Sequence, residues 1–145
     1  MGFRFSLAPV LRLREGLEKR EELALHKVEL EVAMVKRRID RLTEELAQVS
    51  NEREEALQKW MRAAQLKNLQ DEMNASVELR RNLLETLVEL KNKREIQMNV
   101  YQAARVDRRI LSDLRKQKLG AWEQDQLRNQ QKQLDDMFAA RSQRD

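Results

Sequence analysis

Residues 28–49 read VELEVAMVKRRIDRLTEELAQV, and apolar side chains recur in this stretch at alternating intervals of four and three residues. The same frame continues to residue 63, and its positions are Val28, Val32, Val35, Ile39, Leu42, Leu46, Val49, Arg53, Ala56, Trp60 and Ala63. All of them except Arg53 are apolar, although the chain as a whole is only 41% hydrophobic. A sustained 3.5-residue period of this kind predicts the seam of a left-handed coiled coil.

The composition of the whole chain agrees with long helices. Of 145 residues, 81 are Ala, Glu, Lys, Leu or Arg, and there are 3 Gly and 1 Pro. That profile is typical of coiled coils and argues against a β-rich or α/β fold. There is no Cys, so disulfides, thiolate metal sites and cysteine nucleophiles are impossible, which fits a reducing compartment.

A second helical stretch follows the first, with a poorer seam. Its best frame is Leu83, Leu87, Leu90, Arg94, Gln97, Tyr101, Ala104, Arg108, Leu111, Arg115, Lys118 and Trp122, in which the Arg, Gln and Lys positions are polar. Gly120 interrupts this frame near Trp122 and is a position at which the helix can bend.

The best candidate for a turn between the two stretches is Asp71–Ser76, because Asn and Ser favour caps and turns. We predict one coiled-coil domain over residues 1–145, with an N-terminal arm at 1–8, a first helix at 9–69, a turn at 70–75, a second helix at 76–141 and a tail at 142–145. Nearly equal helices joined by a short turn favour an all-α, elongated antiparallel two-helix hairpin, in which the numbers of facing residues add up to roughly 145. The alternative is one unbroken helix of about 130 residues that pairs between chains.

The net charge of +4 is concentrated in one segment. Residues 105–118 contain six basic and two acidic residues, and the rest of the chain is neutral. We expect a basic collar formed by Arg105, Arg108, Arg109, Arg115, Lys116 and Lys118, with Lys27, Lys36, Arg37 and Arg38 brought alongside by the predicted register. Such a collar attracts an acidic protein surface, an anionic membrane or nucleic acid. The alternative is a solvated face with ion pairs between residues four apart.

The sequence holds few residues that could form a catalytic or ligand-binding site. His26 is the one histidine, no Gly-rich phosphate loop is present, and the longest uncharged run, Ile96–Ala104, has nine residues. A membrane span needs about 20 apolar residues, and shifted catalytic pKa values need burial that two helices hardly provide. We therefore expect no catalytic, cofactor or metal site and no integral membrane segment. Exposed apolar residues near the turn, among them Leu79, Leu84 and Val88, are expected either to bind a partner or to face the opposite helix.

Three motifs point to a known family. They are the opening Phe3-Arg4-Phe5-x-Leu7-x-x-Val10-Leu11-x-Leu13-Arg14, the second-helix run Tyr101-x-x-Ala104-Arg105-x-Asp107-Arg108-x-x-Leu111-x-x-Leu114-Arg115, and the tail Trp122 … Gln131-Lys132-x-Leu134-Asp135-Asp136 … Arg141. Together they resemble the flagellar FliJ family over the whole chain.

The resemblance implies a non-enzymatic, cytoplasmic component of the flagellar type III export apparatus, peripheral to the inner membrane at the flagellar base. Members are two-helix coiled coils similar to the central stalk of rotary ATPases. They associate with the export ATPase ring, promote its activity, contact the export gate protein FlhA and bind export chaperones.

By this resemblance, a base made of both termini enters the ring through Leu7, Val10, Leu11, Arg14, Leu134, Asp135 and Asp136. The tip of the hairpin, with Trp60, Leu79, Leu83 and Leu87, faces the export gate. Two other hypotheses are a homodimeric coiled-coil scaffold unrelated to export and non-specific nucleic-acid binding through the collar. We expect no nucleic-acid partner, because aromatic residues for stacking, such as Tyr101, are scarce near the collar.

Overall fold

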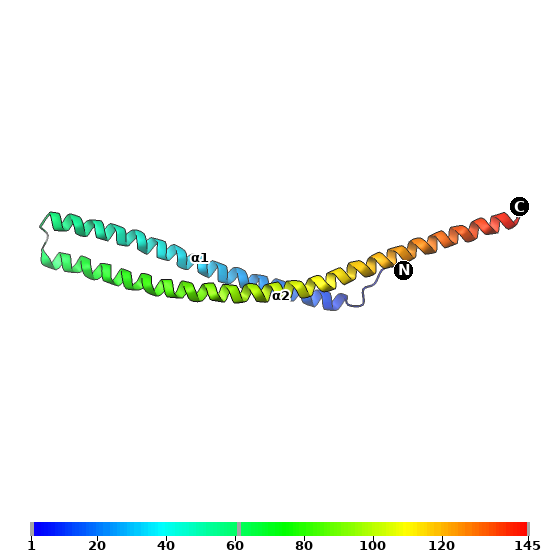
Figure 1. Ribbon diagram of the computed structural model, residues 1–145, viewed down its shortest axis with the longest axis horizontal. Helices are drawn as coiled ribbons and strands as arrows, with labels where there is room; N and C mark the ends of the chain where they lie inside the picture. The colour runs from blue at the N-terminus through cyan, green and yellow to red at the C-terminus, as the bar shows by residue number, and fades with distance from the viewer. Residues whose placement is uncertain (1, 61, 145) are drawn as a thin grey trace. The chain divides into compact units, whose positions relative to one another are not determined.

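The computed structural model describes residues 2–60 and 62–144. Helix α1 spans Ala8–Gln58 and helix α2 spans Ala63–Arg144, with 51 and 82 residues respectively. The two helices run antiparallel and are joined by a short turn (Figure 1), and no strand occurs within the described ranges. The all-α antiparallel hairpin predicted from the sequence is confirmed, and one unbroken helix is excluded.

The hairpin divides into two compact units, and both helices contribute to each of them. One unit comprises Met1–Arg20 and Gln102–Asp145, and the other comprises Glu21–Tyr101. We call the first the terminal unit, because it holds the N-terminal arm and the last part of α2. We call the second the turn unit, because it holds the connection between the helices. The structure therefore divides what the sequence presents as one coiled-coil domain.

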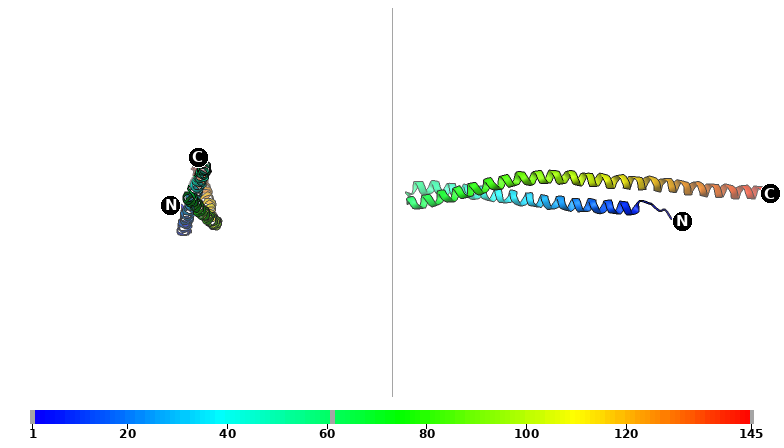
Figure 2. Two further views of the ribbon diagram at one scale, coloured as in Figure 1. Left: turned by 90° about the vertical axis from the view of Figure 1, so that its left-hand side faces the viewer. Right: turned by 90° about the horizontal axis from the view of Figure 1, so that it is seen from below.

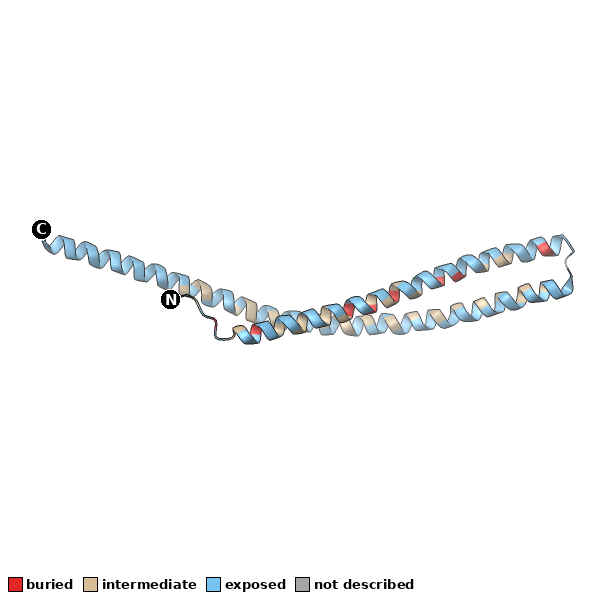
Figure 3. Cartoon of the chain, turned by 180° about the vertical axis from the view of Figure 1, so that it is seen from behind, coloured by how far each residue is buried: buried red, intermediate tan, exposed pale blue. Residues whose placement is uncertain are grey.

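In the turn unit, the seam of α1 follows the predicted heptad. Its buried residues are Leu25, Val28, Val32, Ile39, Leu42 and Ala56. Three further heptad positions, Val35, Leu46 and Val49, are half-buried, and Arg53 is exposed. The predicted frame is wrong at Trp60 and Ala63, which are exposed and lie beyond the end of α1. No residue of α2, a helix described over its full length, is buried (Figure 3). Two helices cover only one stripe of each other, so the apolar core is a shallow seam rather than a deep interior.

The seam of α2 agrees with the predicted frame over most of its length. Every predicted position from Leu83 to Leu111 is half-buried, and the same spacing extends back towards the turn through Leu66, Leu69, Met73, Ser76 and Arg80. Beyond Leu111 the prediction is confirmed at Trp122, which is half-buried, and wrong at the two positions between them. Arg115 and Lys118 are exposed, and Leu114 and Leu119 are half-buried instead. Neither Gly16 nor Gly120 interrupts its helix.

The turn lies earlier in the chain than the sequence suggests. Helix α1 ends at Gln58 rather than near residue 69, and α2 begins at Ala63 rather than at residue 76. The amide of Lys59 donates to the carbonyl oxygen of Glu55 at 3.0 Å. Trp60 then adopts a φ of 56°, in the left-handed region where helices commonly terminate. Glycine is the usual residue at such a position, and its absence explains why the sequence pattern missed this turn.

The predicted turn, Asp71–Ser76, lies inside α2. Its polar residues are accommodated by the helix itself, since Gln70 Nε2 donates to Asn74 Oδ1 at 3.0 Å, four residues further on. Met73 and Ser76 occupy half-buried seam positions. Residues that favour caps in isolation are thus held in a continuous helix by packing against α1.

The displaced turn changes the register of the hairpin. In the terminal unit Arg14 contacts Asp107 rather than Gln131, which the predicted register places opposite it. In the turn unit, Arg80 Nε donates to Thr43 Oγ1 at 3.0 Å, and Gln97 Nε2 donates to Glu21 Oε2 at 2.6 Å. Residues 27–40 therefore face the part of α2 between Arg80 and Gln97 and not residues 105–118. The expectation that Lys27, Lys36, Arg37 and Arg38 lie beside the collar is wrong, as is the expectation of nearly equal helices.

The conformation of Trp60 gives a prediction about stability. A left-handed conformation costs a residue with a side chain roughly 1–2 kcal/mol, and the Trp60 side chain is 96% exposed, so its removal loses little packing. We expect Trp60→Gly to raise the free energy of unfolding by about 1 kcal/mol, after the entropic cost of glycine is subtracted. Trp60→Val should lower it, because a β-branched residue is strained at positive φ. Urea unfolding measures both changes, and a destabilised Trp60→Gly variant would contradict the assigned turn.

Candidate interaction surfaces

The basic collar lies on α2 in the terminal unit, and two of its six residues are engaged within the hairpin. Arg108 Nε donates to Glu18 Oε2 at 2.6 Å, and Arg108 Nη2 donates to Glu18 Oε1 at 3.3 Å. The guanidinium of Arg115 lies over the ring of Phe3, 5.9 Å from its centroid. The collar therefore stabilises the hairpin as well as presenting charge. Its other four residues, Arg105, Arg109, Lys116 and Lys118, are exposed.

The carboxylate of Glu18 on α1 forms an ion pair with Arg108 of the collar. The Glu18 and Arg108 side chains are only 16% and 26% exposed, so water screens this ion pair incompletely. The hydrogen bond from Arg108 lowers the pKa of Glu18, burial acts in the opposite direction, and the charges of Arg108, Arg105 and Arg109 lower it further. A charged Glu18 is thus the form that the folded hairpin stabilises.

The N-terminal arm packs within the terminal unit. Phe5 and Leu11 are buried, and the ring of Phe3 is tilted by 54° against Trp122 with the centroids 6.1 Å apart, a favourable aromatic geometry. Arg14 Nη1 donates to Asp107 Oδ2 at 3.5 Å. Of the predicted base residues on this side, Leu11 is buried, Leu7 and Arg14 are half-buried, and Val10 is exposed. Leu11, Leu7 and Arg14 therefore hold the hairpin together, and Val10 offers free apolar surface.

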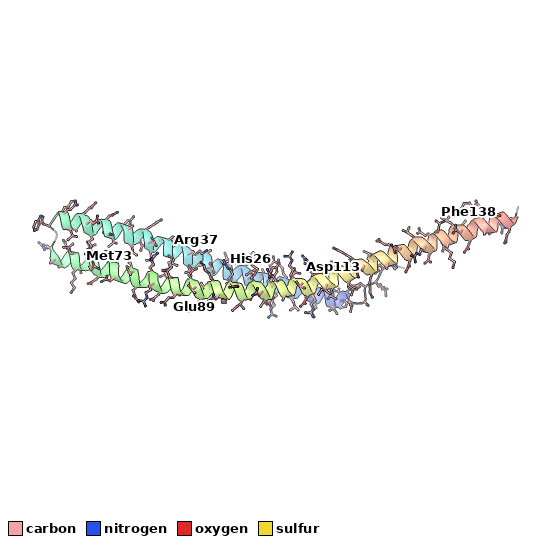
Figure 4. The ribbon with its side chains drawn as sticks, viewed as in Figure 1. His26, Arg37, Met73, Glu89, Asp113 and Phe138 are labelled. Carbon is pink, nitrogen blue, oxygen red and sulfur yellow. The ribbon has the colours of Figure 1, made fainter. Side chains whose placement is uncertain are left out.

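The other predicted base residues lie apart from the arm. Leu134, Asp135 and Asp136 belong to the stretch Glu123–Arg144, every residue of which is exposed. This stretch of α2 runs on beyond the N-terminal arm of the same unit (Figure 2). The expectation that both termini form one base is wrong, because α2 is much longer than α1. Leu127, Met137 and Phe138 are further exposed apolar residues in this stretch, and Phe138 is labelled in Figure 4. They were not predicted as base residues, although their helical spacing with Leu134 was the available signal.

At the turn, the predicted tip residues divide into two classes. Trp60 and Leu79 are exposed, whereas Leu83 and Leu87 are half-buried in the seam with α1. Beside the turn lies a groove of about 410 Å³, lined by Glu52, Glu55, Ala56, Lys59, Gln65, Asn68, Leu69 and Glu72. A second exposed apolar group on α2 comprises Val77, Leu84 and Val88. The turn unit thus presents apolar surface near the tip, although not through all the residues expected.

No polar or charged side chain is buried among the described residues. His26 is exposed, and its Nδ1 lies 3.8 Å from Glu29 Oε2, three residues further along α1. Within residues 2–60 and 62–144, no group of three or more His, Cys, Asp or Glu residues is arranged to hold a metal ion. Over the same ranges, neither helix has a stretch both long and apolar enough to cross a membrane.

The Glu18–Arg108 pair gives a prediction about pH. The folded pKa of Glu18 lies below its ordinary value of 4.5, so the pair contributes stability above that pH and loses it as the pH falls through the folded pKa. We expect Glu18→Gln to lower the free energy of unfolding at pH 7 by about 1 kcal/mol. The difference from the wild-type chain should shrink at about pH 3.

Urea unfolding at both pH values measures this effect. Glu15→Gln is the matched control, because Glu15 is an exposed glutamate in the same turn of α1. A destabilisation by Glu18→Gln that is equal at pH 7 and pH 3 would show that the charge of Glu18 is not what stabilises the hairpin.

Comparison with known proteins identifies the family to which this hairpin belongs. The family model described as "Flagellar FliJ protein" matches residues 3–145. No curated protein and no solved structure matches the chain. The family match extends over both units, from the N-terminal arm to the exposed end of α2. The chain therefore belongs to the flagellar FliJ family, whose members are components of the flagellar export apparatus.

Proposed function

We propose that this chain is a non-enzymatic stalk of the export apparatus that inserts into the export ATPase ring and promotes its activity. The observation that carries the proposal is the exposed stretch of α2, Glu123–Arg144, in a chain matched to the family over residues 3–145. A single helix without a partner along its length fits a ring opening, where surrounding subunits contact it from several sides. Leu134, exposed by 50%, supplies apolar surface there, and Asp135 and Asp136 supply charge beside it.

The arm and the collar have different parts in this proposal. Leu7, Leu11 and Arg14 fix the N-terminal segment to α2, so their contribution to ring binding is indirect. Val10, in the first turn of α1 next to the arm, is an exposed apolar residue that can contact the ring directly. Arg105, Arg109, Lys116 and Lys118 remain available to an acidic surface of the ring, which makes this part of the contact sensitive to salt.

The turn unit is the part that we propose to contact the export gate protein FlhA and the export chaperones. Trp60 is the most exposed of the large apolar side chains that the structure describes, and Leu79 lies among the exposed apolar residues of α2 near the same end. Both are better candidates than Leu83 and Leu87, which pack in the seam. We place the protein in the cytoplasm, peripheral to the inner membrane at the flagellar base.

The proposal predicts that exposed residues near the end of α2 control the ATPase. We expect the wild-type chain to stimulate the cognate export ATPase and to co-sediment with it. Leu134→Glu should raise the concentration of the chain that gives half-maximal stimulation by roughly tenfold. This is the scale of one lost apolar contact at an interface. The substitution leaves the hairpin seam intact, because Leu134 lies outside it.

Leu30→Glu is the matched control, because Leu30 is an exposed leucine on α1 in the turn unit. It should stimulate the ATPase like the wild-type chain. Stimulation that is unaffected by Leu134→Glu, or lost equally in both variants, would contradict a ring contact at the end of α2.

A further inference from the structure

The end of α2 carries an apolar stripe that the rest of residues 2–60 and 62–144 leaves uncovered. Leu127, Leu134 and Phe138 are 65%, 50% and 68% exposed. They recur at seven and four residues, the spacing of one helix face. A mostly polar helix that exposes such a stripe has surface suited to another helix.

The stripe is not a continuation of the seam between α1 and α2. At about 100° per residue, Leu127, Leu134 and Phe138 point roughly 150° away from Leu111 and Trp122, which face the N-terminal segment. A longer α1 packed along the existing seam would therefore leave the stripe uncovered. The stripe needs a partner that approaches from another side.

The stripe defines a coiled-coil heptad of its own. Leu127 and Leu134 fall at d positions, and Gln131 and Phe138 fall at a positions. The flanking e positions hold Arg128 and Asp135, of opposite charge, and the flanking g positions include Glu123 and Arg144, also of opposite charge. In an antiparallel pair of helices, e residues meet e residues and g residues meet g residues. This pattern of charges is therefore complementary to itself.

We propose that Glu123–Arg144 pairs in antiparallel orientation with the same segment of a second copy of this chain. The two-fold axis lies between Gln131 and Leu134. Leu127 of each copy packs on Phe138 of the other, and Gln131 on Leu134. Asp135 accepts a hydrogen bond from Gln131 Nε2 at 3.2 Å within the helix. Its carboxylate has further lone pairs, which can accept a hydrogen bond from the guanidinium of Arg128 in the second copy.

Charge selects this orientation over the parallel one. The antiparallel pair forms two Arg128–Asp135 and two Glu123–Arg144 contacts by symmetry. A parallel pair, in which g residues meet e residues five positions on, gains only Glu123–Arg128, twice.

The polar Gln131 positions keep the association weak, so the fraction of dimer depends on protein concentration. The segment is also the one assigned to the ATPase ring, so the two contacts exclude each other. The self-pairing does not depend on the ring contact being correct.

Charge exchange in the full chain tests the proposal, with sedimentation equilibrium at low salt as the measurement. Arg128→Asp should raise the dimer dissociation constant about tenfold, because two attractive contacts become repulsive. Adding Asp135→Arg to the same chain restores opposite charges at both e positions and should return the constant to within about twofold of wild type. Arg37→Asp, an equal change of charge on exposed α1, should leave it unchanged.

Two results would overturn the proposal. One is a wild-type chain that stays monomeric at every concentration, in which case the stripe serves the ring or another protein. The other is dimerisation that is insensitive to Arg128→Asp or is not rescued by the double exchange. Circular dichroism of each variant checks that the helices are retained.

Cross-linking tests the orientation directly, because the chain has no Cys of its own. Gln124 and Arg141 occupy a and d positions of one antiparallel layer. A mixture of Gln124→Cys and Arg141→Cys chains should form disulfides between unlike copies on oxidation. Disulfides between like copies would indicate a parallel pair, and no disulfide would indicate no pairing through this face, so either result overturns the antiparallel arrangement.

Discussion

Arg80, Gln97 and Arg108 occupy seam positions on α2, and each donates a hydrogen bond to a residue of α1. Two helices cannot surround such groups with protein, yet each is half-buried and would lose hydration without a partner. Thr43, Glu21 and Glu18 supply the acceptors. Apolar heptads pack almost equally well when shifted by a whole repeat, so the polar pairs are what make one register better than its neighbours.

The register in turn determines which surfaces are free. With α1 ending at Gln58, the N-terminal arm reaches Trp122 on α2, and every residue of α2 from Glu123 to Arg144 is exposed. The same register places Glu18 against Arg108 in the terminal unit, whereas Lys36 and its basic neighbours belong to the turn unit. The shallow seam of the turn unit and the exposed helix end of the terminal unit give one chain both a hairpin core and free apolar surface.

How much the sequence predicts depends on how strongly each feature is patterned. The heptad from Val28 to Val49 is dense in apolar residues, and the structure confirms it. The turn carries no comparable signal, because Trp60 takes a conformation usually left to glycine, and Asp71–Ser76 resembles a turn while remaining helical. One misplaced turn then displaced the register, the neighbours of the collar and the composition of the base. Burial at Leu11, Leu83 and Leu87 depends on the partner helix and follows only once that register is known.

A distance between the two helices of the turn unit tests this register most directly. Spin labels at Glu44→Cys and Arg81→Cys lie next to the Thr43–Arg80 hydrogen bond, on exposed positions of a chain without other cysteines. The register described above predicts a label separation of roughly 10–20 Å, the scale of neighbouring helices and two label side chains. A turn at residues 70–75 would place Gln102 opposite Thr43 and move Arg81 roughly 30 Å along the helix. A separation of the two labels greater than roughly 30 Å would contradict the Thr43–Arg80 pairing and the register that it fixes.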